Sequence, residues 1–310
     1  MKRLFALTLA ILMMLSVFTG CGGEKAAEKP AEAPAAGEAA APAAPEQLDI
    51  VRVGVTAWPA SLDPVTKMGW TQTRILYQVY DTLLYCEDDS TISSYICDSW
   101  TRIDEHTTEY KLKEGITFHN GYPLTAEDIK FTYDRVLFDD TGYVDPNVTA
   151  VVNTIESVEV VDELTVRIIT KIADPIIFDR VASSLGVYIV SKQYIEEVGN
   201  ETFGVQPVGT GPFKVDYITP ENLMLSYYEG YYGEKPAMKQ LEYRYFSEEM
   251  AMVTSLITGE IDLANNMTPT AATMLEGQKN LALFSQPYST SHMLNDDQNL
   301  HVQLPVPMPD

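Results

Sequence analysis

Alternation of apolar and polar residues predicts β-strands over much of the chain beyond residue 48. Residues 49–56 alternate and are rich in β-branched side chains, which is typical of a strand. Residues 157–170 contain two alternating runs that turn near Asp162 and Glu163, as a hairpin does. Further strands are predicted at 107–112, 116–119, 213–218, 222–228, 240–246 and 260–265.

Apolar residues spaced by three or four positions predict helices between these strands. The best defined begins after Thr125, an N-cap candidate paired with Asp128 in an aspartate variant of the capping box. Another helix is expected to begin after Ser191 and to stop at Gly199. Because helices and strands mix irregularly, the fold class is mixed α/β (α+β) rather than a doubly wound sheet. Further helices are predicted at 71–85, 173–183 and 247–258.

The N-terminus has the features of an export signal. Two basic residues are followed by an apolar run at 4–18 that is too short for a stable spanning helix. Gly20 then precedes Cys21, as in bacterial lipoprotein signals that are cut before a lipidated cysteine. We therefore predict a lipoprotein signal peptide at 1–20 and lipidation of Cys21. A plain signal peptide with an incidental cysteine is the alternative.

The segment at 21–47 consists mainly of Ala, Pro and Glu and contains no aromatic residue. Such a segment buries too little apolar area to offset chain entropy, and repeated proline blocks a continuous helix. We expect a disordered tether that holds a folded domain outside the cytoplasmic membrane, at the cell surface or in the periplasm. Two or three acyl chains on Cys21 would make this attachment durable.

Composition limits the partners of the folded part. Acidic residues outnumber basic ones by 44 to 21, the net charge is −23, and the sequence pI is about 4.4. A chain of this charge repels phosphate backbones, so nucleic acid is not an expected partner, and no polybasic membrane patch is expected. With 310 residues, of which 45% are apolar, the chain is long enough to bury a sizeable core.

Two cysteines, Cys86 and Cys97, lie in the predicted folded part. An oxidising compartment would allow a disulfide between them, and two free buried thiols are the alternative. The four histidines show no zinc spacing with these cysteines or with one another. Neither a metal site nor a cofactor is therefore expected.

The run Gly209-Thr210-Gly211-Pro212 looks like the start of a phosphate-binding loop. Such a loop needs its glycines at a strand-to-helix turn, so that a helix N-terminus points at the anion. Here an alternating strand follows instead of a helix, and the usual Lys-Ser/Thr pair is missing. We predict a tight structural turn, with positive φ at one or both glycines, that directs the next aromatic residue into the core.

Several motifs together resemble family 5 of the extracytoplasmic solute-binding proteins, which serve peptide and nickel ABC transporters. They follow the order and roughly the spacing of that family, between about Ile50 and Ala264. The motifs are Ser-Leu-Asp-Pro at 61–64, Phe-His-Asn-Gly at 118–121, Leu-Thr-Ala-Glu-Asp-Ile at 124–129, Gly-Thr-Gly-Pro-Phe at 209–213, Tyr-Tyr-Gly-x-x-Pro at 231–236 and Leu-x-x-Gly-Glu-Ile-Asp at 256–262.

This resemblance implies a periplasmic-binding-protein-like type II fold, in which two lobes close on a solute. Residues 48–285 match the first lobe only, and the Asp-x-Arg-x-Arg-x-Ala pattern with which the family continues is absent. The tail at 286–310 is polar and then proline-rich. We interpret the chain as C-terminally truncated, with a frameshifted or prematurely ended tail. A genuine divergent tail is the alternative.

The resemblance also implies which residues meet the solute. In the family, the loop after the first strand faces the cleft, and its backbone helps to grip the solute. Within that loop, Trp58 is either an apolar wall for the ligand or core packing. The ligand-binding candidates are Thr56, Ala57, Trp58 and Pro59. The remaining motif residues are expected to be structural, namely His119, Gly121, Gly209, Thr210, Gly211 and Pro212.

The implied function is that of a monomeric, lipid-anchored substrate-binding component of an ABC importer. It would capture di- or oligopeptides outside the membrane and deliver them to a permease. One alternative is that the solute is a nickel chelate or an oligosaccharide. Another is that the chain is a non-transporting remnant of such a protein. An exported hydrolase is disfavoured, because the sequence contains neither Gly-x-Ser-x-Gly nor His-Glu-x-x-His. We therefore do not expect an enzyme.

Overall fold

A computed structural model describes residues 48–66, 69–87, 90–183, 187–278, 280–285 and 300–303. The predicted signal peptide, Cys21, the tether and most of the predicted tail lie outside these described residues. Within the described part of the chain, every helix falls short of the length and apolar content that crossing a membrane requires.

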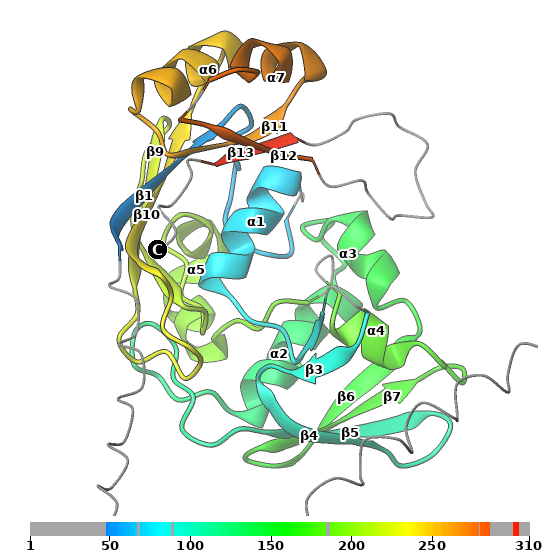
Figure 1. The fold of residues 1–310 in the computed structure, drawn as a ribbon. Coiled ribbons are helices and arrows are strands. Elements are labelled where there is room, and N and C mark those ends of the chain that lie inside the picture. The colour runs from blue at the N-terminus through cyan, green and yellow to red at the C-terminus, as the bar shows by residue number, and fades with distance from the viewer. Residues whose placement is uncertain are drawn as a thin grey trace, which may run out of the picture. The chain divides into compact units, whose positions relative to one another are not determined.

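The larger of the sheets has seven strands. They are β1 (Leu48–Val55), β8 (Phe213–Ile218), β9 (Asn222–Tyr227), β10 (Met238–Tyr245), β11 (Leu263–Met267), β12 (Ala282–Ser285) and β13 (Leu300–Gln303). Their spatial order is β12-β13-β11-β1-β10-β9-β8 (Figure 1). The central strand β1 pairs parallel with β10 and β11, and all other pairs are antiparallel.

Helices cover both faces of this sheet. Helix α6 (Glu249–Thr258) packs on the face of β1 that includes Gly54. A Cβ atom added to Gly54 would lie 2.8 Å from Met252 Cγ. Helix α7 (Pro269–Leu275) contacts α6. Helix α1 (Trp70–Val79) lies against the opposite face, and its buried residues share a core cluster with Val53 and Leu241.

A second, antiparallel sheet has the order β4-β5-β7-β6 and packs against α2 (Figure 1). Its members, the small β2–β3 ladder and the remaining helices have the following bounds: β2 (Leu84–Cys86), β3 (Ile92–Ser94), β4 (Cys97–Arg102), β5 (Thr107–Leu112), β6 (Ile155–Asp162), β7 (Thr165–Thr170), α2 (Ala126–Leu137), α3 (Pro146–Val151), α4 (Ile177–Val181) and α5 (Lys192–Val205). The predicted mixed α/β fold class is therefore confirmed.

The sequence predicts secondary structure best where an element depends only on residues near it in the chain. The predicted strand at 107–112 coincides with β5, and the Asp128 carboxylate accepts hydrogen bonds from the Thr125 N–H (2.9 Å) and hydroxyl (3.0 Å) at the start of α2. Two predictions need correction. The helix predicted at 71–85 ends at Val79, and the predicted strand at 116–119 is a single bridge. The stop predicted at Gly199 is confirmed, since this residue is non-helical, with φ of +79°, and divides α5 into two helical segments.

The sequence left open whether Cys86 and Cys97 form a disulfide or are two free buried thiols, and in the structure both are free thiols. The Cys97 N–H donates to the carbonyl of Leu83, which lies three residues before Cys86 along the chain. Three strand residues span about 10 Å, whereas bridged cysteines have Cα atoms within about 7 Å. Cys86 is exposed, while Cys97 is buried in the core, and this burial raises the pKa of its thiol to about 12.

The described residues form three hydrophobic clusters, of which the third is built by α6, α7 and β11. The two larger clusters fill the two halves of the fold, one under each sheet. The chain passes between them at residues 80–83 and again at 187–190. In the second crossing, Val187 and Ile189 belong to the cluster of the four-stranded sheet, while Tyr188 and Val190 belong to that of the larger sheet. This segment is thus shared by both cores.

The Gly209-Thr210-Gly211 turn closes against the end of α1 at the first crossing. The predicted positive φ is wrong, since neither glycine is among the positive-φ residues. The glycines are instead required by close backbone contact. A Cβ on Gly209 would lie 2.0 Å from Val79 O, and one on Gly211 would lie 2.6 Å from Val79 C. The turn does direct Phe213 into the core, where 1% of its surface remains exposed.

His119 holds this turn from the other side. The Gly209 N–H donates to Nδ1 (3.3 Å), and Nε2 lies 2.9 Å from Gly211 O. A ring nitrogen that accepts a hydrogen bond carries no proton, so the imidazole is neutral with its proton on Nε2. Burial lowers the pKa of His119 to about 4. Gly121, with φ of +88°, forms the adjacent turn that the sequence predicted.

Asp81 meets the same turn and is fully buried. Its Oδ2 accepts hydrogen bonds from the Thr210 hydroxyl (3.0 Å) and the Tyr232 hydroxyl (2.9 Å), while Oδ1 has no hydrogen-bond partner among the described residues. Burial raises the pKa of Asp81 to about 6, although these two hydrogen bonds act against the rise. The Thr210 hydroxyl thus helps to hold the buried Asp81 carboxylate in place.

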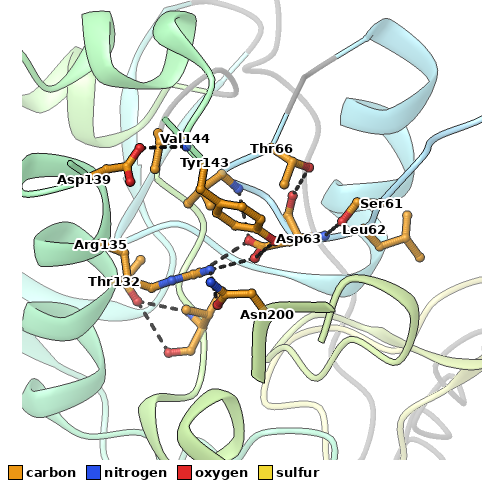
Figure 2. Close-up of polar contacts among 12 residues, drawn as sticks. Ser61, Leu62, Asp63, Thr66, Thr132, Arg135, Asp139, Tyr143, Val144 and Asn200 are labelled. Atoms are coloured by element: carbon orange, nitrogen blue, oxygen red, sulfur yellow. Dashed lines mark hydrogen bonds and ion pairs between the residues drawn. The ribbon is translucent and has the colours of Figure 1, made fainter. Parts of the chain in front are cut away.

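The Asp63–Arg135 ion pair joins the loop after β1 to α2 at the boundary of the two clusters (Figure 2). Asp63 is fully buried and lies between Leu62, in one cluster, and Val65, in the other. Its carboxylate accepts hydrogen bonds from Arg135 Nη2 (2.6 Å) and the Tyr143 hydroxyl (3.1 Å). The Ser-Leu-Asp-Pro motif therefore fixes the course of this loop.

We predict that Asp63→Asn destabilises the protein by about 3–5 kcal/mol, because it leaves the Arg135 guanidinium without its buried counter-charge. The free energy of unfolding from urea titration measures this loss. Glu109→Gln is the matched control, since it removes the acid of an ion pair with Arg167 whose side chains are 31% and 41% exposed. The control should cost less than about 1 kcal/mol. Equal losses in both variants would contradict the assigned role of Asp63.

We also predict opposing pH dependences from His119 and Asp81. As the pH falls from 6.5 to about 4, unfolded His119 takes up a proton and the folded residue does not, so stability falls. As the pH falls from about 6 to 3.8, folded Asp81 takes up a proton and the unfolded residue does not, so stability rises. Each slope is at most roughly 1.4 kcal/mol per pH unit, so the two largely cancel between pH 6 and 4.

Asp81→Asn separates the two effects, because the amide oxygen still accepts hydrogen bonds but no longer titrates. Urea unfolding near pH 7, 5.5 and 4.5 should show a steeper loss of stability on acidification in this variant than in the unmodified chain. His119→Gln should show the reverse, with a smaller loss than the unmodified chain. A variant Asp81→Asn with an unchanged slope would contradict this assignment.

Candidate ligand-binding site

A cavity of about 850 Å³ lies between α1 and the larger sheet. This volume falls within the range of small-molecule sites in proteins. Eight of the lining residues are apolar, four are tyrosines, and three carry other polar groups. The lining consists of Leu48, Val51, Val53, Arg74, Tyr77, Gln78, Tyr85, Tyr95, Pro212, Ala237, Met238, Leu241, Tyr243, Leu263 and Asn265.

The floor of the cavity follows from strand periodicity. Alternate residues of β1 point to the same face, so Val51 and Val53 reach the cavity. The parallel register places Leu241 beside Val51 and Tyr243 beside Val53. Leu263 of β11 pairs with Val53 from the other side. Three neighbouring strands therefore present one continuous, mainly apolar surface.

The wall of the cavity comes from one stripe of α1. Arg74, Tyr77 and Gln78 stand at spacings of three and four residues, so they share a face of the helix. Ile75 and Leu76, on the other side of α1, are fully buried in the core. The helix thus holds a polar stripe over an apolar floor.

Tyrosines supply most of the remaining polar groups. Tyr85 and Tyr95 pack with ring centroids 5.5 Å apart, and Tyr77 meets Tyr188 edge-on at 5.7 Å. Burial raises the pKa of Tyr243 to about 12, and the guanidinium of Arg74 acts against that rise. The Tyr243 hydroxyl therefore stays neutral at physiological pH. The tyrosines offer aromatic faces to a solute.

The four residues predicted to bind ligand lie elsewhere, at the end of β1, and none of them lines the cavity. Trp58 packs against the core cluster of the larger sheet, and its ring centroid is 6.0 Å from that of Tyr245. Ala57 is exposed and Pro59 is buried, while Thr56 and Trp58 are half-buried. Contact of this loop with a solute remains a prediction.

The sequence analysis missed the cavity residues, although weak signals for some of them were present. Arg74 and Tyr77 are polar or amphipathic positions on a helix whose apolar stripe is formed by Ile75, Leu76 and Val79. Tyr243 and Leu241 are two residues apart on a predicted strand, so they lie on the same face of the sheet. Neither pattern shows that the two elements face each other, because that depends on pairing between residues far apart in the chain.

The described residues contain no group of three or more His, Cys, Asp or Glu side chains that would hold a metal ion. The groups that converge on the cavity are instead hydroxyls, amides, one guanidinium and apolar side chains. Such a surface is suited to holding an organic solute by burial and hydrogen bonding.

Comparison with curated proteins finds relatives that bind small solutes. The chain is 33% identical to a Brucella ovis protein named as an ABC transporter peptide-binding protein, over 51% of this chain and 30% of that protein. It is 26% identical to the nickel-binding periplasmic protein of Escherichia coli, over 71% of this chain and 41% of that protein. The matched region is thus less than half the length of either relative.

Solved structures show the same fold. The oligopeptide-binding protein AppA of Bacillus subtilis, in complex with a nonapeptide, superposes with a TM-score of 0.71 at 22% identity, over 78% of this chain and 49% of that protein. This partial coverage agrees with the predicted type II fold and with a match to a single lobe. Residues 91–305 also match the family described as bacterial extracellular solute-binding proteins, family 5 middle. The chain therefore belongs to family 5 of the bacterial extracellular solute-binding proteins.

Proposed function

We propose that the chain is the substrate-binding component of an ABC importer, which captures peptides outside the membrane and delivers them to a permease. The observation that carries this proposal is the cavity between α1 and the larger sheet in a chain of this family. The names of the relatives support the transport class, since they describe binding of peptides and of nickel.

The cavity lining favours a peptide-like solute over other candidates. An apolar floor takes side chains, while the amide of Gln78 on the wall offers a partner for peptide groups. The residues that line the cavity include no histidine, which a nickel site would favour. They also include no Ser, Cys, His, Asp or Glu, so they supply no nucleophile–base pair for a hydrolase.

The chain would provide one wall of a two-walled site. In the proposed mechanism a solute shifts a binding protein from an open to a closed arrangement of two lobes. Each hydrogen bond supplied by a second lobe would add about 0.5–1.5 kcal/mol of affinity. We therefore expect this chain alone to bind peptides weakly, and a non-transporting remnant is the alternative if it binds none.

We further propose that Cys21 carries a lipid anchor and that residues 21–47 form the tether. The support is the sequence itself, in which a basic start, an apolar run and a small residue precede the cysteine. An anchored binding protein stays close to its permease, which raises the effective concentration of the captured solute there.

We predict that trileucine binds the purified chain in isothermal titration calorimetry and that Gln78→Trp weakens this binding by about tenfold or more, because the larger side chain fills the cavity. Gln193→Trp is the matched control, since this exposed position on α5 lies outside the cavity lining. The control should change affinity by less than about twofold. Absence of trileucine binding to the unmodified chain would contradict the proposed peptide function.

We predict that Cys21→Ser abolishes incorporation of radiolabelled palmitate when the chain is expressed in a bacterium, because lipidation requires the thiol. The variant should also move from the membrane fraction to the soluble fraction. Cys86→Ser is the control, since this exposed cysteine lies in the folded part. Unchanged labelling in the Cys21 variant would contradict lipidation of Cys21, and absence of labelling in the unmodified chain would support the plain signal peptide instead.

A further inference from the structure

Asp81 lies at the point where the main parts of the described fold meet. It follows the end of α1 at Val79, and α1 forms the wall of the cavity. Its backbone carbonyl accepts a hydrogen bond from the Ile189 N–H (2.9 Å), so the two crossings between the larger hydrophobic clusters are joined at this residue. Its side chain is fully buried. A change in the charge of Asp81 therefore acts on the end of the cavity wall and on the junction of two cores.

The Asp81 carboxylate holds the glycine turn, which supplies one residue of the cavity lining. Its Oδ2 accepts a hydrogen bond from the Thr210 hydroxyl (3.0 Å), two residues before Pro212. Pro212 lines the cavity. Between these two residues, the Gly211 N–H donates to Val79 O (3.0 Å) at the end of α1. The position of Pro212 therefore depends on the bond between Thr210 and Asp81.

The same oxygen is connected through Tyr232 to a second residue of the cavity lining. Oδ2 also accepts a hydrogen bond from the Tyr232 hydroxyl (2.9 Å). Lys113 Nζ lies 5.4 Å from the centroid of the Tyr232 ring, a cation–π distance, and donates to the backbone carbonyl of Tyr95 (2.6 Å). Tyr95 lines the cavity, where its ring centroid is 5.5 Å from that of Tyr85. A continuous series of contacts thus joins Asp81 to Tyr95.

The other oxygen of this carboxylate can take a proton. Oδ1 is buried and has no hydrogen-bond partner among the described residues. A buried acceptor without a donor is costly. A proton on Oδ1 would remove the charge and still leave the lone pairs of Oδ2 for Thr210 and Tyr232. The site therefore accommodates a neutral Asp81 without breaking either hydrogen bond.

Loss of the charge weakens these two hydrogen bonds. A hydrogen bond to an ionised acceptor is roughly twice as strong as one between neutral groups. Burial raises the pKa of Asp81 to about 6, and the hydrogen bonds from Tyr232 and Thr210 act against that rise, because they favour the ionised form. Protonation thus relieves the cost of burying the charge, but it leaves the glycine turn and Tyr232 less firmly held.

The phenols and the imidazole around Asp81 do not titrate between pH 5 and 7. Burial lowers the pKa of His119, on the other side of the glycine turn, to about 4. Lys113 is the nearby cation, and its charge favours the ionised form of Asp81. Burial raises the pKa of the surrounding phenols, which are Tyr95, Tyr188, Tyr231 and Tyr232. Among the acids of this cluster, Asp81 alone titrates in that range.

We infer that Asp81 is a positioning residue of the solute cavity, which binds its solute more tightly when the Asp81 carboxylate is ionised than when it is protonated. This inference rests on the proposed function and adds a pH dependence to it. The ionised carboxylate holds Pro212 and Tyr95 in place, and the neutral acid holds them less firmly. A solute captured near neutral pH is therefore bound less tightly in an acidic medium.

The first test is the affinity for trileucine at pH 5, 6 and 7, measured by isothermal titration calorimetry. The charges at the two ends of trileucine change little over this range. The unmodified chain should bind at least about threefold more tightly at pH 7 than at pH 5, because two charge-assisted hydrogen bonds become neutral. Asp81→Asn should bind at pH 7 as the unmodified chain binds at pH 5, and its affinity should change by less than about 1.5-fold across the range.

Asp128→Asn is the matched control. Asp128 is another buried carboxyl whose pKa burial raises, but it caps α2, accepts a hydrogen bond from the Lys192 N–H (2.9 Å) and does not line the cavity. This variant should keep the pH dependence. Thr210→Val and Tyr232→Phe should each weaken binding at pH 7 and reduce the pH dependence, and they decide the question if Asp81→Asn does not fold. An affinity of the unmodified chain that is independent of pH, or an equal loss of pH dependence in the Asp128 variant, would overturn the inference.

Nuclear magnetic resonance separates this inference from the proposed function, because it requires no solute. The ring signals of Tyr95 and the amide signal of Gly211 should shift with pH in the unmodified chain, with a midpoint of about 6, and should not shift in Asp81→Asn. If they shift but trileucine binds at no pH, the peptide function is refuted and the positioning role stands. If trileucine binds but these signals do not follow the pH, the positioning role alone is refuted.

Discussion

The buried ion pair between Asp63 and Arg135 determines how the two halves of the molecule meet. It lies where the loop after β1 passes from one hydrophobic cluster to the other, and no water-exposed surface remains on the carboxylate. The attraction between the two charges of such a pair offsets the cost of desolvating them only when the pair has good geometry. The loop and α2 are therefore fixed relative to each other, and the hydrogen bond from Gln72 Nε2 to Ser61 O (2.9 Å) joins α1, the wall of the cavity, to the same loop.

The sequence was informative wherever a signal acts within a few residues. The capping box of Thr125 and Asp128, the turn at Gly121 and strand β5 all depend on neighbours in the chain and were predicted correctly. Gly209 and Gly211 were recognised as a structural turn, but for the wrong physical reason. Side chains are excluded at both positions by the backbone of Val79, some 130 residues earlier. Local conformational preferences do not predict that contact.

The candidate site shows more clearly this difference between features that depend on nearby residues and features that depend on long-range contacts. The family resemblance directed attention to the loop after β1, whereas the cavity lies beside it and is formed by residues of α1, β1, β10 and β11. Periodicity in the sequence identifies the apolar face of each strand. It does not identify the register that aligns Val53 with Tyr243, nor the bulge that brings Asn266 to Arg74. Those features depend on tertiary pairing.

The segment at 187–190 has a consequence for how the protein loses its structure. Because Val187 and Ile189 pack into one core while Tyr188 and Val190 pack into the other, neither core can open without pulling side chains out of the second. Two sheets with separate interiors would ordinarily behave as independent foldons. Here the shared segment couples them, so the two described halves are expected to unfold together as a single cooperative unit.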